Sequence, residues 1–440
     1  MNQLQIFLPC AAGVEDFLAH EVHGLTGLKG EDLLTRRGGV MARASWRDAM
    51  LLNLHSRLAQ RVLVQLSYTD YRGEQDLYRA ASEVAWEVWF TPKQSIKVEV
   101  TAQHSPLTSL NFAALKIKDA VCDRFRDKAH GVRPDVNTQW PDVRIYAHLT
   151  TDTCSLYIDT SGEPLFKRGW REDKGDAPLK ETLAAAMLAA CGWADGDEDL
   201  LPLYDPCCGS GTVAIEAAQI ACNIAPGSLR RFAFEKYIPF QQHVWDGIKQ
   251  EAAAGVVKPE PGQRPLIYGS DVAHRMVDFA QRNAERAGVA DVIEFRGGDA
   301  LQRMPPTEIP GVLLLNPPYG DRIAVAGVSG AGARRSGAPH HSERDGGRND
   351  APLPDYEAQS GAREQAVTED GGEFFSQLAT HWKKNYSGWT GWILTPDLKL
   401  PSKMRLKESR RVPLWNGPIE CRLFRFDMVK GAARERKPAA

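Results

Sequence analysis

The stretch Leu201–Ala218 places the tightest constraint on the fold of this chain. An apolar segment ending at Tyr204 leads into Asp-Pro-Cys-Cys-Gly-Ser-Gly-Thr (205–212), and a helix-forming run follows. A strand, a glycine turn and a helix in this order are typical of a parallel α/β sheet. The turn lets the backbone approach a ligand closely, while the N–H groups of the helix point at that ligand.

The same loop also narrows the class of ligand. It lacks the lysine of a phosphate-binding GxxxxGK[ST] loop, and no third glycine follows at the spacing of a dinucleotide-binding loop. Asp205 ends the strand and supplies a carboxylate to the crevice where open α/β sheets bind ligands. An adenosine that carries a zwitterionic amino acid suits this arrangement better than a pyrophosphate does.

Two more predicted strands are followed by an aspartate. The run 266–271 ends at Asp271, and the run 292–295 leads to Gly298 and Asp299. A carboxylate at the end of the second strand can accept hydrogen bonds from both ribose hydroxyls, and Asp299 is placed to accept one from an adenine amino group. Any single aspartate could instead cap a helix. Three acidic strand ends in order favour a nucleoside site.

The segment Asn316-Pro317-Pro318-Tyr319 follows the apolar run 312–315, which is predicted to be a buried strand of a parallel sheet. Two prolines fix φ and remove two N–H donors, so the carbonyls nearby are left free to accept. An amide side chain, rigid carbonyls and an aromatic ring suit the binding of a planar group that carries an NH2. The simpler alternative is a strand that ends in a proline turn.

Size and composition exclude several classes of protein. The 440 residues suffice for two or three domains, and 43% apolar with 25% charged residues is typical of a soluble globular protein. We expect no membrane span and no signal peptide. Eight scattered cysteines without zinc-type spacing indicate a reducing cytoplasm. A net charge of −2 argues against an indiscriminate nucleic-acid binder, although a local basic patch could still bind RNA.

The first 160 residues are predicted to form two small α/β units. Strands are expected at 3–8, 62–66, 95–101, 143–149 and 155–158, and helices at 13–24, 46–57, 77–89 and 113–128. The last helix carries five basic side chains, but three aspartates offset much of their charge. Both a solvated amphipathic helix and an RNA-binding helix therefore stay open.

The second half alternates strands and helices. A linker at about 162–176 precedes a helix from about 178 to 191, in which Lys180 and Glu181 are minor site candidates. A helical insertion is expected at about 222–255, helices at 273–287 and 373–386, and strands at 391–394 and 421–426. Residues 326–372 have nine glycines and one aromatic residue, a composition that predicts a mobile insertion beside the site. Ordering of this insertion over bound RNA is the alternative.

Several segments resemble one family. The segments 111–120, 133–134, 141–144 and 165–171 resemble the THUMP domain and its exit segment in bacterial 23S rRNA guanine-N2 methyltransferases, and 414–423 resembles the same family. The loop 205–212 resembles the first motif of class I S-adenosylmethionine-dependent methyltransferases. The resemblance implies an α/β fold class, a Rossmann-like class I methyltransferase domain preceded by a ferredoxin-like plus THUMP α+β RNA-binding region. The implied limits are 1–65 (ferredoxin-like), 66–160 (THUMP), 161–177 (linker), 178–430 (methyltransferase) and 431–440 (basic tail).

The resemblance implies methylation of the exocyclic N2 amine of a guanosine by S-adenosylmethionine, without a metal. Structured RNA is the implied partner, with 23S rRNA or a precursor particle favoured, and the oligomeric state stays open. The implied cofactor-binding residues are Asp205, Pro206, Cys208, Gly209, Ser210, Gly211, Thr212, Asp271, Asp299 and Asn316. The implied catalytic residues are Asn316, Pro317, Pro318 and Tyr319.

Four alternatives compete with this hypothesis. Guanine-N2 methylation of tRNA is the main one, because THUMP domains are common among tRNA-modifying enzymes. A DNA adenine-N6 methyltransferase would normally add a large target-recognition domain, for which too few residues follow the insertion. A release-factor methyltransferase would have a smaller helical front domain. A non-enzymatic RNA-binding assembly factor would predict a damaged cofactor loop, and the loop is intact. Some members of the family fuse a second methyltransferase domain at the C-terminus, and we expect a single modification from this chain.

Overall fold

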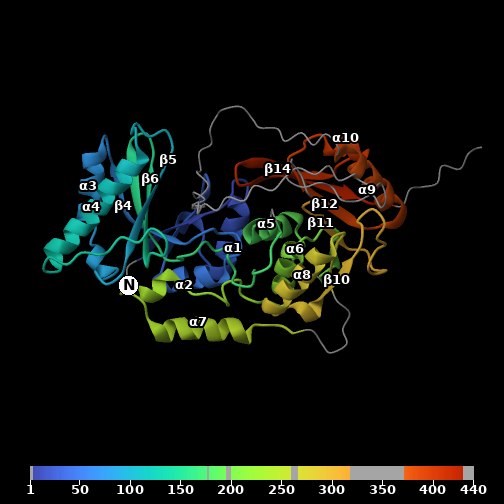
Figure 1. The fold of residues 1–440 in the computed structure, drawn as a ribbon, viewed down its shortest axis with the longest axis horizontal. Helices are drawn as coiled ribbons and strands as arrows, with labels where there is room; N and C mark the ends of the chain where they lie inside the picture. The colour runs from blue at the N-terminus through green and yellow to red at the C-terminus, as the bar shows by residue number, and fades with distance from the viewer. Residues whose placement is uncertain (1–2, 176–177, 195–199, 259–265, 318–370, 430–440) are drawn as a thin grey trace, which may run out of the picture.

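The computed structural model describes residues 3–175, 178–194, 200–258, 266–317 and 371–429. Two seven-stranded sheets organise these residues, one in each half of the chain (Figure 1). Among the described residues, no helix combines the length and the apolar character that crossing a membrane requires. The α/β fold class is the one that the sequence predicts.

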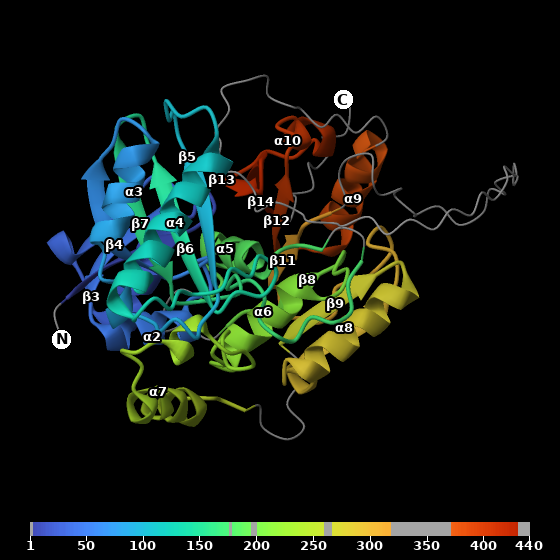
Figure 2. The same cartoon turned by 60° about the vertical axis from the view of Figure 1, so that its left-hand side comes forward.

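The first sheet has the strand order β2-β3-β1-β4-β7-β6-β5, and within it only β5 and β6 pair in parallel. Its strands are β1 (Leu4–Pro9), β2 (Leu33–Arg36), β3 (Gly39–Ala44), β4 (Leu63–Asp70), β5 (Ile96–Ala102), β6 (Val143–Leu149) and β7 (Thr153–Asp159). The helices of this half are α1 (Glu15–Thr26), α2 (Trp46–His55), α3 (Glu74–Glu83) and α4 (Leu110–Lys128). Figure 2 shows α3 and α4 side by side over β4 and β5.

Strand β4 is shared by the two α/β units of the front half. It pairs with β1 through Leu63 and Val64, and it pairs with β7 from Leu63 to Asp70. The predicted limit between the ferredoxin-like and THUMP units, at 65/66, therefore falls inside a strand. The two units form one continuous sheet, and their exact limits stay a prediction.

Two local predictions differ from the structure. The helix expected at 77–89 ends at Glu83, because Val84 has extended backbone angles (φ −69°, ψ 131°) and a 3-10 turn follows at Trp86–Val88. The aromatic side chains that suggested a longer helix pack from this turn, with Trp86 fully buried. The hairpin of β2 and β3 was not predicted, since β2 is mostly exposed and shows no alternation of apolar residues.

The second sheet has the order β10-β9-β8-β11-β12-β14-β13, in which the first five strands are parallel. Its strands are β8 (Leu203–Asp205), β9 (Ile267–Asp271), β10 (Ile293–Gly297), β11 (Val312–Leu315), β12 (Thr390–Thr395), β13 (Arg410–Asn416) and β14 (Ile419–Asp427). Its helices are α5 (Glu181–Cys191), α6 (Thr212–Ala221), α7 (Gln242–Ala254), α8 (His274–Arg286), α9 (Gly371–Asn385) and α10 (Leu400–Met404). Helices α6 and α8 pack against β8, β9 and β10.

The insertion expected to be helical at 222–255 is helical only in its second part. Pro226 lacks a backbone N–H and restricts the residue before it, so the helix expected from Cys222 does not form there. A 3-10 turn (Ala233–Lys236) and helix α7 follow instead. The insertion predicted at 326–372 lies outside the described residues, except for its last two, which begin α9; the tail 431–440 also lies outside them.

A buried ionic cluster joins the front half to helix α6. The carboxylate of Glu216, on α6, is fully buried and accepts from Arg168 Nε at 3.1 Å and from Arg57 Nη1 at 3.4 Å. Arg57 follows α2 and also donates to the carbonyl of Ile224 at 2.6 Å. Arg168 belongs to the segment between the sheets and donates to the carbonyl of Leu165 at 2.8 Å. The cluster thus ties three parts of the chain to the helix that follows the glycine loop.

Candidate active site

The ends of β8 and β11 define the candidate site. These strands are parallel neighbours, with Leu203 opposite Val312 and Tyr204 opposite Leu313. From β8 the sheet continues through β9 and β10 on one side and through β11 and β12 on the other, so the strand order reverses here. Such a switch point is where open α/β sheets bind their ligands. The glycine loop after β8 and Asn316 after β11 therefore lie at the same edge of the sheet.

The glycine loop has the backbone that only glycine adopts easily. Gly209 and Gly211 have φ values of 53° and 87°. A Cβ atom on Gly211 would also lie 3.0 Å from the Cβ of Ala280, on α8. Helix α6 begins directly after this residue, at Thr212. Its first N–H groups therefore point into the crevice, where they can bind an electronegative group of a ligand.

The three predicted aspartates come together around Cys207. Burial raises the pKa of the Cys207 thiol well above its usual value, and the charges of Asp205, Asp271 and Asp299 raise it further. Asp299 Oδ1 accepts from the N–H of Leu301 at 2.9 Å. β8, β9 and β10 are parallel neighbours, with Asp205 opposite Gly269 and Asp271 opposite Gly297, so the carboxylates follow adjacent strands at one edge of the sheet. Their role in a nucleoside site stays a prediction.

Asp271 also holds the glycine loop itself. Its Oδ2 accepts from the N–H of Gly209 at 3.0 Å, and its Oδ1 accepts from the N–H of Ala273 at 2.9 Å. The carboxylate is half-buried, and each oxygen keeps a further lone pair for a ligand hydroxyl. Asp271 therefore also holds the backbone of the glycine loop in place, a role that its position at a strand end did not indicate.

Asp205 is a buried carboxyl with an unusual proton affinity. It is 2% exposed, and its Oδ1 accepts from the N–H of Cys207 at 3.0 Å. Burial, with a contribution from the charge of Asp271, raises the pKa of Asp205 to about 8, although the hydrogen bond from Cys207 opposes the shift. A cation bound in the crevice would favour the ionised form of this carboxyl.

The side chain of Asn316 offers a hydrogen-bond acceptor that no described residue uses. Its side-chain oxygen Oδ1 is buried and accepts no hydrogen bond from any residue that the structure describes. A buried polar atom left unpaired costs about 1–3 kcal/mol, which a ligand N–H would recover. Pro317, the next residue, is buried. The remaining predicted catalytic residues, Pro318 and Tyr319, lie outside the described residues.

Arg171 is a site residue that sequence reasoning missed. Its guanidinium donates to Ser210 Oγ at 2.7 Å and to Thr212 Oγ1 at 2.8 Å, within the glycine loop. Its Nε also donates to the buried carboxylate of Glu181 at 2.7 Å. Asn283 supports the same loop from α8, since its Nδ2 donates to the carbonyl of Ser210 at 3.0 Å. A single arginine in a linker looks like any surface cation, and the family resemblance of the segment 165–171 assigned no role to Arg171.

The two minor candidates differ in their relation to the loop. Glu181 is 4% exposed and acts on the loop only through Arg171. Lys180 precedes α5, and its ammonium lies 5.2 Å from the centre of the Phe166 ring. Burial lowers the pKa of Lys180. Neither side chain has a contact that marks it as a ligand of a cofactor.

Three family models match consecutive parts of the chain. They are the RlmL ferredoxin-like domain at residues 5–63, the THUMP domain at residues 71–159, and the RMKL-like methyltransferase domain at residues 168–330. Their order is the order in which the sequence predicts a ferredoxin-like unit, an RNA-binding domain and a methyltransferase domain.

Curated relatives match over nearly the whole chain. A candidate RNA methyltransferase of Synechocystis sp. is 32% identical over 423 residues, which cover 96% of each chain. The ribosomal RNA large subunit methyltransferase K/L of Psychromonas ingrahamii is 34% identical over 440 residues, which cover 99% of this chain and 52% of that protein. Its counterpart from Shewanella amazonensis is 35% identical over 416 residues, covering 94% and 52%. The chain thus spans about half the length of the K/L proteins that it matches.

Solved structures share the fold. A candidate methyltransferase complexed with S-adenosylhomocysteine superposes with a TM-score of 0.77 at 24% identity and covers 98% of this chain and 100% of that one. A Listeria monocytogenes protein described as an N6-adenine-specific DNA methylase has a TM-score of 0.75 at 27% identity, covering 97% and 96%. The predicted fold class, a methyltransferase domain behind ferredoxin-like and THUMP domains, is confirmed.

Proposed function

The chain belongs to the family of THUMP-domain RNA methyltransferases, and we propose that it methylates the exocyclic N2 amine of a guanosine in 23S rRNA with S-adenosylmethionine. The named K/L relatives, which act on ribosomal RNA of the large subunit, support the substrate. The Oδ1 of Asn316 carries the proposal, because it has no partner among the described residues and offers an acceptor to an amino group next to the glycine loop.

The residues at the edge of the sheet fit S-adenosylmethionine. We assign the amino-acid end to the glycine loop and Asp205, the ribose hydroxyls to Asp271 and the adenine amino group to Asp299. When bound, the cofactor supplies a methyl group on a positively charged sulfur. The buried carboxyl of Asp205 and the half-buried carboxylates of Asp271 and Asp299 balance that charge and give the crevice the acceptors that a nucleoside requires.

The chain's own contribution to the reaction is the orientation of the amine. The lone pair of guanine N2 is shared with the ring, so the amine must be held in a reactive direction. Asn316 Oδ1 and the carbonyl of Pro317 accept the two N2 hydrogens, and Tyr319 stacks on the base. Positioning of this kind can supply several kcal/mol of the barrier. The released proton goes to solvent, and a target base in a helix must first be flipped out.

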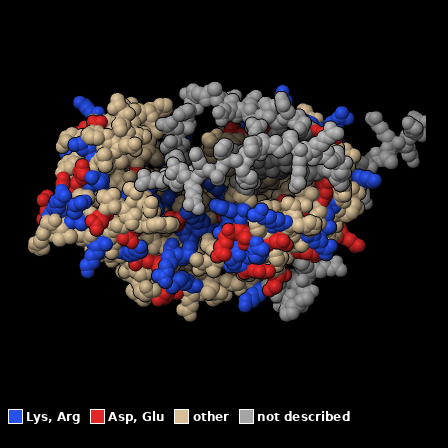
Figure 3. All heavy atoms as spheres, in the orientation of Figure 1, with Lys and Arg blue, Asp and Glu red and all other residues tan. Residues whose placement is uncertain are grey.

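The front half has features that fit RNA. Phe112 and Trp140 are 47% and 73% exposed, and the ammonium of Lys116 lies 5.4 Å from the centre of the Phe112 ring. Exposed aromatic rings beside cations can stack on unpaired bases. Farther along α4, ion pairs engage Arg124 and Arg126, so the solvated-helix interpretation describes that end of the helix. In Figure 3, Lys and Arg side chains gather near the middle of the face, where the two halves meet.

The substrate is tested by methylation of separate nucleic acids. The protein is incubated with in vitro-transcribed 23S rRNA, with tRNA and with duplex DNA, each with radiolabelled S-adenosylmethionine, and the products are mapped by mass spectrometry. We expect N2-methylguanosine in 23S rRNA alone. Label in tRNA alone would support the tRNA alternative, and methyladenine in DNA would support the DNA alternative.

We place the enzyme in the cytoplasm because its proposed substrate is there.

Asp205 is expected to make the binding of S-adenosylmethionine depend on pH. The pKa of this carboxyl is about 8 in the free protein, and a cationic ligand lowers it, so binding below that pH releases a proton. Affinity should therefore rise up to about tenfold per pH unit as the pH increases toward about 8, and level off above it. Calorimetry in buffers of different ionisation enthalpy measures the number of protons that are released when the cofactor binds. Asp205→Asn should remove the pH dependence, and a flat wild-type profile would contradict the assignment.

Arg171→Lys is expected to weaken S-adenosylmethionine binding at least about tenfold, because lysine keeps the charge but cannot bridge two hydroxyls and Glu181 at once. RNA binding without the cofactor should not change, which separates loop positioning from a general loss of structure. The control is Arg282→Ala, which removes a half-exposed ion pair with Asp173 and should bind the cofactor normally. Unchanged cofactor affinity in Arg171→Lys would refute the positioning role.

A further inference from the structure

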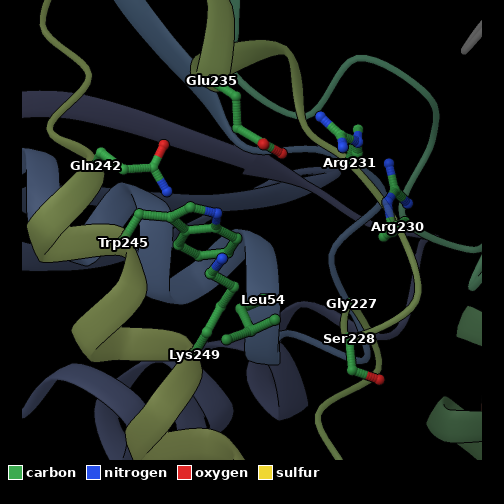
Figure 4. Close-up of a pocket in the computed structure, with 9 residues that line it drawn as sticks. All are labelled: Leu54, Gly227, Ser228, Arg230, Arg231, Glu235, Gln242, Trp245 and Lys249. Atoms are coloured by element: carbon green, nitrogen blue, oxygen red, sulfur yellow. The ribbon is translucent and has the colours of Figure 1, made fainter.

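A cavity of about 420 Å³ lies away from the candidate active site, where the insertion 222–255 packs against the end of α2 (Figure 4). None of the residues assigned to the active site lines it. Its lining consists of Leu54, Gly227, Ser228, Arg230, Arg231, Glu235, Gln242, Trp245 and Lys249. Its volume is in the range of ligand pockets, and its lining is mainly polar.

Trp245 presents an unpaired donor to this cavity. The residue is 3% exposed, and within the described part of the chain its ring contacts Phe232, Phe234 and Lys249. Its indole N–H donates to none of the described residues. Figure 4 shows the indole nitrogen facing the space between Glu235 and the two arginines. The indole nitrogen faces the cavity (Figure 4), so a ligand oxygen bound there can accept a hydrogen bond from it.

The charges of the lining favour an anion. Arg231 is exposed and forms no ion pair with a described residue. Lys249 lies on α7, where its ammonium contacts Asp246 at 2.9 Å. Burial lowers the pKa of Arg230 to about 10, so this side chain is still charged at neutral pH. Glu235 is the one carboxylate among the lining residues, and its Oε1 accepts from a backbone N–H at 2.8 Å, while Asp246, which is not in the lining, pairs with Lys249.

The cavity is built from three parts of the chain that hold one another in place. Gly227 donates its N–H to the carbonyl of Leu54 at 2.9 Å, and a Cβ on this glycine would lie 2.8 Å from Phe232 Cζ. Arg230 donates to the carbonyls of Pro164 at 2.8 Å and Glu163 at 2.5 Å. The insertion, the first unit and the linker therefore shape the cavity together, and its cations are carried on a fixed backbone.

We propose that this cavity binds a backbone phosphate of the RNA, at a point separate from both the THUMP domain and the active site. The inference rests on the proposed function. A phosphate accepts hydrogen bonds without donating any, which matches a lining of cations, a hydroxyl and an indole N–H. A base or a ribose would need more acceptors than Glu235 and Gln242 supply. The contact adds affinity and fixes the position of the RNA without reading its sequence.

The test compares two double variants of the full chain. Arg231→Ala with Lys249→Ala removes two cations from the cavity, whereas Lys29→Ala with Arg410→Ala removes two exposed cations that do not line it. In vitro-transcribed 23S rRNA is the probe, and its dissociation constant is measured at several salt concentrations. We expect about tenfold weaker binding for the cavity variant and a salt slope reduced by about 0.7–0.9, since one phosphate contact is lost. The control variant should bind like the wild type.

Trp245→Phe provides an independent second variant, because it keeps an aromatic ring and removes the N–H. We expect it to weaken RNA binding about threefold to tenfold with an unchanged salt slope, since the lost hydrogen-bond donor carries no charge. The thermal midpoint and the S-adenosylmethionine affinity serve as controls for folding in all variants. Unchanged RNA binding in both the cavity double variant and Trp245→Phe would overturn the proposal.

Two further measurements are needed. One distinguishes a free anion from an RNA phosphate, and the other distinguishes a failure of the cavity proposal from a failure of the proposed function. Calorimetry with inorganic phosphate and with guanosine monophosphate tests a free anion. Binding of either to the wild type but not to the cavity variant, with RNA affinity unaffected, would overturn the assignment to RNA. If the wild type neither binds nor methylates 23S rRNA, the proposed function fails. If it methylates the rRNA and the cavity variants bind normally, only the cavity proposal fails.

Discussion

Asn316→Ala is expected to reduce turnover by about 10²- to 10³-fold or more, while the dissociation constant of S-adenosylmethionine changes less than about twofold. The alanine removes the buried oxygen that has no partner among the described residues, and with it the acceptor that orients the amine. The hydrogen bonds that hold Asp205, Asp271 and Asp299, the carboxylates to which we assign cofactor binding, do not involve Asn316 and are not altered. Single-turnover kinetics with saturating cofactor and RNA measures the loss directly.

Asn316→Asp is the matched control for this prediction. Aspartate has nearly the same size and keeps an acceptor oxygen in place, so it should retain more activity than alanine does. The comparison separates loss of the acceptor from loss of the side chain's volume. Wild-type turnover in Asn316→Ala would refute the assigned role. A parallel loss of cofactor affinity would instead place Asn316 in cofactor binding and leave the orientation of the amine to other groups.

Glu216→Ala is expected to destabilise the protein by about 3–5 kcal/mol, the largest stability effect that we predict. The substitution leaves the guanidinium groups of Arg57 and Arg168 without their shared carboxylate, in a place where the Arg168 side chain is 1% exposed. An uncompensated charge in such a position costs far more than a surface pair contributes. Because Glu216 lies on the helix after the glycine loop, the loss should also loosen the attachment of the front half to the cofactor-binding half.

The measurement is urea unfolding, together with hydrogen exchange at α6. Glu251→Ala is the matched control, since Glu251 pairs with Arg47 on the surface, where both side chains are largely exposed (69% and 47%). Such a pair contributes about 0–1 kcal/mol, so this variant should unfold almost like the wild type. If the two variants lose the same stability, the buried cluster does not have the role that we assign to it.

Local patterns were enough to predict the order of elements from β8 to β12 in the methyltransferase half, whereas α10 and β13 were not predicted. Strand alternation, positive φ and strand ends are local properties, because each is set by neighbouring residues. These properties were enough to identify the apolar run before Asp205, the glycines at 209 and 211 and the aspartates at 271 and 299. The strand 312–315 was predicted with its observed bounds. Since parallel strands present their carboxyl ends at one edge, these local signals also predicted that the aspartates and Asn316 meet.

The tertiary structure alone decided which distant side chains hold that edge in place. Arg171 reaches Ser210 across the linker, and Arg57 reaches Glu216 although 159 positions separate them along the chain. The sharing of β4 by two units and the cavity around Trp245 likewise depend on how separate segments pack. The periodicity of the sequence does not indicate which residue a charged or polar side chain will contact, because that contact depends on the path of the whole chain. The sequence determined what the site is made of, and the fold determined what keeps it rigid.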